Sequence, residues 1–273
     1  MITPPADCRS SPAIGSVRLR APDPNTTWRS PTHATPRPAV EPCVRDQRRY
    51  AGEVANWSCV LWDVDGTVVD ASEGILRRLI EAHEHFGHVP PTHDDLIHWI
   101  GPPMYQSFQE RLGMTSEEAT GAVTFYRTLN KRDGYATGVR LYDGIAELMA
   151  EIAAAGIPQS TASSKPEPQV VALMDHFALD GHLAATVGSS PDERTRASKT
   201  DVIREALLRL EAQGADISRP VLVGDRHHDV DGGAETGVPV IFVSWGFSEP
   251  AESDGAIAVA HDAHELRALL LGE

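Results

Sequence analysis

The stretch Cys59-Val-Leu-Trp-Asp-Val-Asp-Gly-Thr-Val-Val-Asp70 (CVLWDVDGTVVD) runs from apolar residues directly into two aspartates, Asp63 and Asp65, that are one residue apart. The apolar run predicts a buried β-strand over residues 59–63. Two carboxylates placed so close together repel each other, and burial makes that repulsion more costly. The pattern therefore indicates that another group offsets the charge, and a metal ion or a charged substrate would do so.

The composition is that of a globular protein with a substantial core. The chain has 273 residues, of which 41% are hydrophobic, and its formal net charge is −15. Such a charge argues against a nucleic-acid backbone as the main partner, but it does not argue against a small phosphorylated substrate, because local charge decides binding at a site. No apolar run approaches the length of a membrane span, so we expect no membrane partner either.

Cysteine usage favours a reducing, cytoplasmic compartment. The three cysteines are Cys8, Cys43 and Cys59, and their spacing is not that of a metal site. We therefore expect no disulfide. The sequence does not indicate the oligomeric state.

Residues 1–56 differ in composition from the rest of the chain. They contain nine of the 20 prolines, together with eight arginines and five acidic residues, which gives this segment a charge of +3. No hydrophobic periodicity is sustained over this range. The segment is therefore predicted to be a disordered tail rich in proline and arginine.

From residue 57 onward, apolar strand patterns alternate with helical ones. Strands are predicted near 59–63, 158–163, 183–188, 221–224 and 239–245, with a probable edge strand at 256–259; helices are predicted near 73–86, 144–155, 167–177, 200–213, 230–236 and 262–271. This alternation predicts an α/β fold: a Rossmann-like parallel sheet with helices on both faces.

One block interrupts the alternation after the first strand. Residues 75–140 show helical patterns, at about 93–112 and 116–132, and no strand signal. We interpret them as an inserted α-helical subdomain, with the α/β core formed by residues 57–74 and 141–273. Because ligands bind beyond the carboxyl ends of parallel strands, Asp63, Ser163 and Asp225, each at such an end, are expected to meet at one site.

Several motifs resemble those of the haloacid dehalogenase-like superfamily. DVDGTVVD (63–70) resembles the first motif, DxDGTxxD, and ASSKP (162–166) resembles the second. Lys199 fits the third, and VGDRHHD (223–229) resembles the fourth, GDxxxD. The resemblance covers about residues 57–271 and implies that the helical insert, 75–140, is a small cap over the active site.

The first motif also suits phosphoryl transfer chemically. Asp63 ends a strand and can act as a nucleophile that forms an aspartyl-phosphate. Asp65 is positioned to protonate the leaving oxygen and later to take a proton from water. Gly66 permits the tight turn between the strand and Thr67.

The resemblance implies roles for the remaining motif residues. Mg²⁺ would be held by Asp63, the backbone carbonyl of Asp65, Asp225 and Asp229, because hard cations prefer oxygen ligands. Ser163 would bind a phosphoryl oxygen, and Lys199 would balance the negative charge. Four residues are predicted to bind the substrate: Gly66, Thr67, Ser164 and Lys165.

Some residues keep alternative interpretations. Lys165 competes with Lys199 for the third-motif role. Asp70 is as well suited to capping the following helix as to catalysis. His227 and His228 are adjacent, so they cannot both face one ion from a helix, and we interpret them as surface residues near the site.

Two further stretches narrow the resemblance to one branch. IGPPMYQSF (100–108) and GSSPDERTRASKTDVI (188–203) are similar to segments of phosphoglycolate phosphatase-like and 5′-nucleotidase-like members. The predicted function is Mg²⁺-dependent hydrolysis of a small phosphorylated metabolite, such as phosphoglycolate or a nucleoside monophosphate. Two alternatives stay open: a sugar phosphomutase, which would depend on a bisphosphate activator, and a non-catalytic binding protein on this fold.

Overall fold

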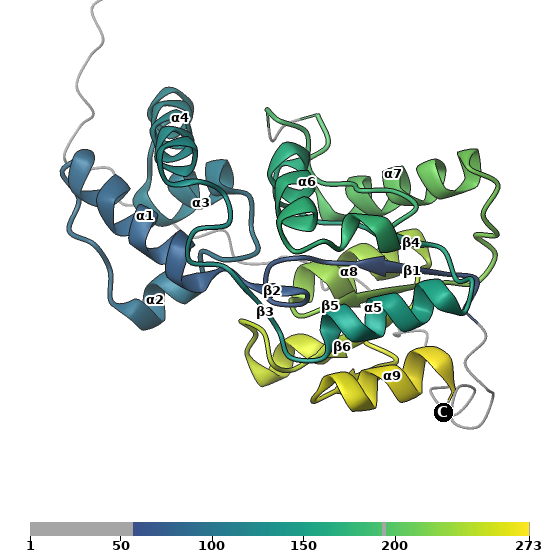
Figure 1. Ribbon diagram of the computed structural model, residues 1–273. Helices are drawn as coiled ribbons and strands as arrows, with labels where there is room; N and C mark the ends of the chain where they lie inside the picture. The colour runs from purple at the N-terminus through teal and green to yellow at the C-terminus, as the bar shows by residue number, and fades with distance from the viewer. Residues whose placement is uncertain (1–56, 193–194, 273) are drawn as a thin grey trace, which may run out of the picture. The chain divides into compact units, whose positions relative to one another are not determined.

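Five parallel strands form the central sheet of the computed structural model, which describes residues 57–192 and 195–272 (Figure 1). Their order is β4-β1-β5-β6-β7. The strands are β1 (Cys59–Trp62), β4 (Gln159–Thr161), β5 (Pro220–Gly224), β6 (Val240–Val243) and the edge strand β7 (Ala258–Ala260). The predicted tail, together with Cys8 and Cys43, lies outside the described residues, and Cys59 is buried with a free thiol.

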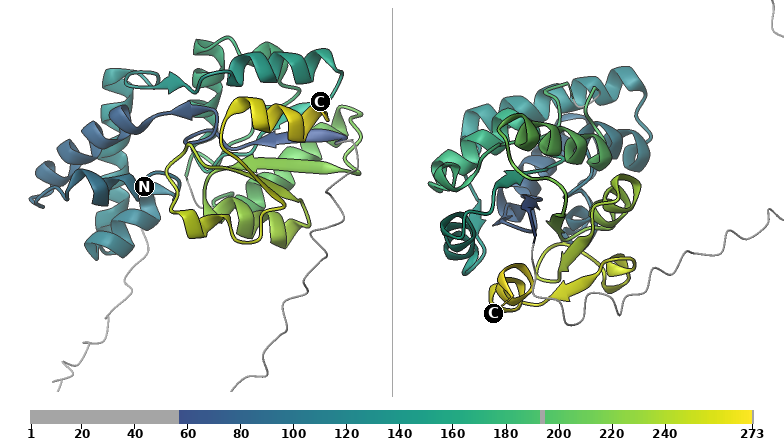
Figure 2. Two further views of the ribbon diagram at one scale, coloured as in Figure 1. Left: turned by 90° about the horizontal axis from the view of Figure 1, so that it is seen from below. Right: turned by 90° about the vertical axis from the view of Figure 1, so that its right-hand side faces the viewer.

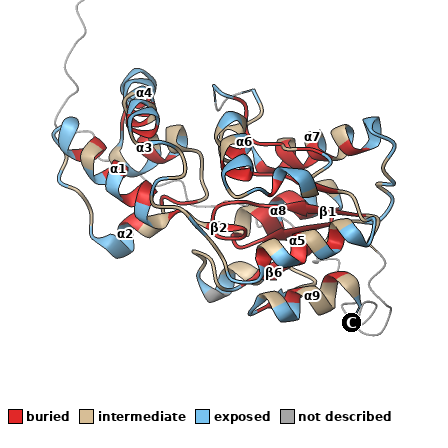
Figure 3. Ribbon diagram, viewed as in Figure 1, coloured by how far each residue is buried: buried red, intermediate tan, exposed pale blue. Residues whose placement is uncertain are grey.

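Helices cover both faces of the sheet, as the alternation predicted. Side chains such as Val60 and Trp62 point into one apolar cluster, and their neighbours Cys59 and Leu61 point into another. The first cluster is completed by α5 (Ile145–Ala154), α6 (Glu167–His176) and α9 (Ala263–Leu271), and the second by α7 (Lys199–Ala212) and α8 (His227–Thr236). Figure 2 shows helices on the two sides of the sheet, and Figure 3 shows the strands buried between them. Burial on both faces explains why the strands are apolar without alternation.

The predicted strand at 183–188 is wrong. This segment follows a short 3-10 helix (Asp180–His182) and lies beside β4, but it makes only an isolated bridge between Ser160 and Ala185. Some backbone hydrogen bonds to β4 are present, among them Thr161 N–H to the Ala185 carbonyl and Ser163 N–H to the Val187 carbonyl, both at 3.3 Å. The Val187 N–H, however, donates to Thr161 Oγ1 at 2.7 Å, a side-chain atom. Regular strand pairing is therefore interrupted at this edge.

Four helices lie together between the first two sheet strands in sequence (Figure 1). They are α1 (Ser72–His85), α2 (His93–Ile97), α3 (Met104–Leu112) and α4 (Ser116–Asp133), and we call residues 72–133 the helical segment. A short antiparallel pair, β2 (Val69–Asp70) with β3 (Arg140–Leu141), connects the segment to the rest of the chain. Two-residue strands are too short for a hydrophobic pattern to reveal, and the sequence did not predict them.

The helical pattern predicted over 93–112 is divided into α2 and α3. Gly101 has φ +110°, which L side chains rarely adopt, and Pro102 and Pro103 follow it. Proline lacks the N–H of a helical hydrogen bond and disfavours helical geometry in the residue before it. Residues 98–103 therefore form a loop, and this loop reaches the candidate site.

Within the described ranges, no helix combines the length and the apolar character that crossing a bilayer requires.

Candidate active site

Asp63 continues the line of β1 and is held at the end of the sheet. Its backbone N–H donates to the Val223 carbonyl of β5 at 2.9 Å, and its residue exposure is 5%. The chain then turns tightly at Gly66, which has φ +93° and donates its N–H to the Val69 carbonyl at 2.8 Å. This turn places Asp65 on a different side of the strand end from the groups that Asp63 faces.

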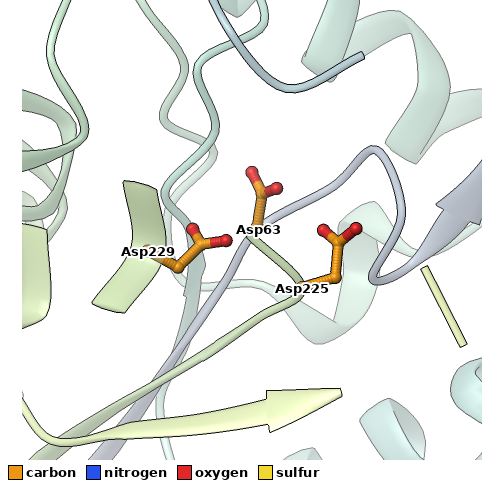
Figure 4. Close-up of side chains that lie close together, drawn as sticks. All are labelled: Asp63, Asp225 and Asp229. Atoms are coloured by element: carbon orange, nitrogen blue, oxygen red, sulfur yellow. The ribbon is translucent and has the colours of Figure 1, made fainter. Parts of the chain in front are cut away.

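Three buried carboxylates meet at this end of the sheet. One oxygen each of Asp63, Asp225 and Asp229 lies within 4.8 Å of the others, and Figure 4 shows the three side chains converging. Asp63 follows β1, Asp225 follows β5, and Asp229 lies in the first turn of α8. Parallel strands with adjacent carboxyl ends bring together residues that are more than 160 positions apart in the sequence.

Asp225 is packed between two glycines. A Cβ added to Gly66 or to Gly246 would lie 2.2 Å from Asp225 Oδ2. The carboxylate accepts hydrogen bonds from Phe247 N–H at 2.8 Å and from Thr67 Oγ1 at 3.3 Å. Burial, together with the charges of Asp63 and Asp229, raises the pKa of Asp225 well above its ordinary value.

Lys199 is the cation in contact with this cluster. Its Nζ lies 2.7 Å from Asp63 Oδ1 and 2.6 Å from Asp229 Oδ1, and it donates to the Ala162 carbonyl at 2.8 Å. Burial alone would lower the pKa of Lys199, but Asp229 and Asp63 outweigh burial and raise it, so the ammonium stays charged.

The cluster fits a divalent cation. Lys199 contacts two of the three buried carboxylates and supplies one positive charge against them, so the cluster has room for a further positive charge. Carboxylate oxygens are the ligands that Mg²⁺ takes in proteins.

Asp65 faces a pocket instead of the carboxylate cluster. Its Oδ2 accepts a hydrogen bond from Lys165 Nζ at 2.7 Å, while its Oδ1 is buried with no hydrogen-bond partner among the described residues. The pocket is lined by Asp65, Ser164 and Lys165 from the α/β part, and by Ile75, the loop end at 100–104, Tyr126 and Arg127 from the helical segment. Asp65 thus lines this pocket and carries one buried oxygen that has no hydrogen-bond partner among the described residues.

The other predicted site residues include Ser163, Gly66 and Thr67, and they differ in what they contact. Ser163, 2% exposed, follows β4, and its Oγ accepts the Lys165 N–H at 3.2 Å. Thr67 is fully buried, and its hydroxyl bonds to Asp225, so Gly66 and Thr67 support that carboxylate instead of lining the described pockets. Their contact with substrate stays a prediction.

The structure also shows what Asp70 and the two adjacent histidines contact. Asp70 Oδ1 accepts from the N–H of Ser72 at 2.9 Å and from its hydroxyl at 2.6 Å, at the start of α1, while Oδ2 accepts from Arg140 at 2.7 Å. Asp70 thus bonds the helix start and β3. His227 and His228 lie beside each other with ring centroids 3.8 Å apart, and His227 Nδ1 contacts Glu252 at 2.9 Å.

Sequence reasoning missed Gly246, Phe247 and the side-chain role of Arg226. The glycine and the Phe247 N–H hold Asp225 from a loop after β6, and no local motif marks that loop. Arg226 lies inside the fourth motif, but only the fold shows which distant groups its side chain reaches.

Comparisons with known proteins agree with this geometry. A family model described as "Haloacid dehalogenase-like hydrolase" matches residues 60–243. The chain is 35% identical to a 5′-nucleotidase from Pseudomonas aeruginosa, over 71% of this chain and 85% of that protein. It is similar to the crystal structure of a predicted phosphatase from Clostridium acetobutylicum, with 31% identity and a TM-score of 0.73, over 80% of this chain and 99% of that one.

A further relative is named as a kinase and not as a phosphatase. The chain is 36% identical to the tyrosine-protein kinase PtkA of Mycobacterium tuberculosis, over 73% of this chain, and it spans 66% of the length of that kinase. The family model covers well over half of the chain, and its range includes the residues that form the carboxylate cluster. The chain belongs to the haloacid dehalogenase-like hydrolases.

Proposed function

We propose that this protein is a Mg²⁺-dependent phosphomonoesterase that acts on a small phosphorylated metabolite through an aspartyl-phosphate on Asp63. The observation that carries the proposal is the position of Asp63: one of its oxygens contacts Lys199 at 2.7 Å, inside a cluster of three buried carboxylates. Asp65, two residues further along the chain, lines the pocket that the helical segment shares with Ser164 and Lys165. The names of the relatives, among them a 5′-nucleotidase and a phosphoglycolate phosphatase, support a small phosphorylated substrate.

The proposed reaction has two displacements at phosphorus. An Asp63 oxygen forms a bond to phosphorus, the bond to the leaving oxygen breaks, and Asp65 gives that oxygen a proton. Water then attacks the phosphorus, Asp65 takes a proton back, and Asp63 is released with inorganic phosphate. Ser163 would donate to a phosphoryl oxygen, and Lys199 would hold Asp63 in place and balance charge.

The residues that would hold Mg²⁺ are Asp63, Asp225, Asp229 and the Asp65 carbonyl. When bound, the ion would neutralise charge on the phosphoryl oxygens. The helical segment, corresponding to the predicted cap of residues 75–140, would supply the pocket wall facing Ser164 and Lys165 and so select the leaving group.

Phosphate release from a panel of phosphorylated metabolites, with Mg²⁺ or with EDTA, tests this proposal. We expect Mg²⁺-dependent release that falls by about 10⁴-fold or more in Asp63→Asn, because the covalent route is lost. Asp70→Asn is the matched control: it lies in the same motif but contacts Ser72 and Arg140, and we expect it to keep turnover. Appreciable release by Asp63→Asn, or release that EDTA does not change, would contradict the assignment.

The kinase relative favours one second candidate, in which the phosphoryl group passes from Asp63 to an acceptor hydroxyl instead of water. Transfer of labelled phosphate from ATP to tyrosine-containing protein, under conditions where no free phosphate appears, would favour it. Turnover that requires an added sugar bisphosphate would instead indicate a mutase.

A further inference from the structure

Arg226 is a buried arginine that the proposed chemistry does not use. It directly follows Asp225, its residue exposure is 5%, and its backbone N–H donates to Asp229 Oδ2 at 3.0 Å. It therefore belongs, through its main chain, to the turn that carries two of the three clustered carboxylates. Its side chain leaves this turn and makes two further contacts.

One contact crosses to the helical segment. Arg226 Nη1 donates a short hydrogen bond to the carbonyl of Ile100, a residue 126 positions earlier in the chain. The approach is close, because a Cβ on the next residue, Gly101, would lie 3.3 Å from Arg226 Cγ. Gly101 thus leaves the space that the arginine side chain occupies.

The second contact fixes the guanidinium from the other side. Arg226 Nε donates to Glu252 Oε2 at 2.8 Å, and the same oxygen accepts the backbone N–H of His227 at 2.9 Å. Glu252 lies in a short 3-10 helix, Pro250–Ser253. Because a charged, forked side chain is held at two points, its geometry is more defined than that of a single surface ion pair.

The 98–103 loop that Arg226 reaches forms part of the pocket. Its residues 100–103 line the pocket together with Asp65, Ser164 and Lys165. The loop is anchored in its own segment by Trp99 and Ile100, which are 2% and 0% exposed. A shift of the loop would therefore move the pocket wall as a unit.

We infer that Arg226 is a positioning residue: its side chain ties the 98–103 loop, one wall of the pocket, to the turn that carries Asp225 and Asp229. We call this connection the latch. It couples the placement of the helical segment to the carboxylate cluster. The effect on substrate turnover that we expect from it rests on the proposed function. Lysine at position 226 keeps the charge but has no fork with which to bond both Glu252 and the Ile100 carbonyl.

Hydrogen exchange and steady-state kinetics on the full chain test the latch. In Arg226→Lys we expect backbone amides of the 98–103 loop to exchange about tenfold faster, because a hydrogen bond to a charged group is lost. We expect KM for the best substrate to rise by about five- to tenfold, with a smaller change in kcat. Glu252→Gln, which leaves Arg226 in place without its charged partner, should shift both quantities in the same direction.

Arg111→Gln is the matched control. Arg111 also donates to a carbonyl of this loop, His98, at 2.9 Å, but it does so from α3 inside the helical segment. We expect Arg111→Gln to leave KM unchanged. We also expect the backbone amides of the 225–229 turn to exchange hydrogen at the wild-type rate in this variant.

Each result decides a separate part of the inference. Loop exchange that is unaltered in both Arg226→Lys and Glu252→Gln would overturn the latch. Faster loop exchange with an unchanged KM would overturn the positioning role. If the wild-type protein releases phosphate from no compound, the proposed function fails, and the exchange measurements still decide whether Arg226 holds the loop.

Discussion

Individual glycines shape this site as much as its charged residues do. Gly66 and Gly246 both lie against Asp225, and neither position has room for a Cβ. Gly66 also needs its positive φ, whereas Gly246 is required only for the space it leaves. This difference makes Gly246 the better position at which to test how tightly Asp225 is held.

We expect Gly246→Ala to weaken Mg²⁺ dependence. The new methyl group would lie 2.2 Å from Asp225 Oδ2 and must displace that carboxylate. Groups that orient a metal ligand typically contribute about ten- to a hundredfold in metal affinity, so the Mg²⁺ concentration for half-maximal phosphate release should rise by about that factor. Gly121→Ala, on α4 with nothing within 4 Å of an added Cβ, is the control and should leave this concentration unchanged. Equal Mg²⁺ requirements in both variants would show that Asp225 can move without consequence.

At the scale of single elements, α1 contains a buried histidine whose protonation would destabilise the helical segment. His83 is 0% exposed, its Nδ1–H donates to the Leu79 carbonyl at 2.7 Å, and its Nε2 has no partner within the described part of the chain. The ring packs edge-on against Trp99. Burial lowers the pKa of His83 below its ordinary value of 6.5, so the folded protein holds a neutral ring.

His83 should therefore make unfolding easier as the pH falls. Because its pKa is lower in the folded state than in the unfolded one, its contribution is fully present above about pH 6.5 and declines below that value, by at most about 1.4 kcal/mol per pH unit. His83→Phe keeps an aromatic ring and removes the titration. Urea unfolding at pH 7.5, 6.5 and 5.5 should give a difference in free energy between the two proteins that shifts in favour of the variant at lower pH. If the free energies of unfolding of the two proteins change equally with pH, the His83 ring is not buried in solution.

The elements also show what the sequence can and cannot predict. β1, α1, α4 and α5 were predicted to within about two residues, because their apolar patterns and stop signals are local. The strand predicted at 183–188 is wrong because the Val187 N–H bonds to a threonine hydroxyl, which interrupts the regular backbone pairing with β4. The break at 98–103 has a local signal in Gly101 and the two prolines that follow it, and the helical pattern predicted over 93–112 runs across that signal. Among the site residues, Asp63, Asp225, Asp229 and Lys199 do meet, while the support from Gly246 and Phe247 depends on tertiary contacts that no local pattern records.

At the scale of the whole molecule, we expect the carboxylate cluster to lower the free energy of unfolding until a cation offsets its charge. Three buried acids with one lysine leave net negative charge in a region of low dielectric constant. The same burial, with the charges of Asp63 and Asp229, raises the pKa of Asp225. An ion that binds the folded chain and not the unfolded one adds to global stability by mass action.

Thermal unfolding with and without Mg²⁺ checks this expectation. At a free Mg²⁺ concentration 100 times the dissociation constant, we expect the free energy of unfolding to rise by about 2.7 kcal/mol. Asp225→Asn, which removes one buried charge, should be more stable than the wild-type protein in EDTA and should gain much less from Mg²⁺. An Asp225→Asn protein that is less stable in EDTA would show that the hydrogen bonds of the carboxylate outweigh its repulsion.

The short pair of β2 and β3 has a consequence for how this protein can change over generations. The chain leaves for the helical segment at Val69–Asp70 and returns at Arg140–Leu141, and these residues are paired side by side. An insertion whose two ends are neighbours can be lengthened, shortened or exchanged by recombination without altering the register of the strands that carry the carboxylates. Mutations in the helical segment can therefore accumulate in one continuous stretch of the gene while the residues of the carboxylate cluster, encoded on either side of it, stay as they are.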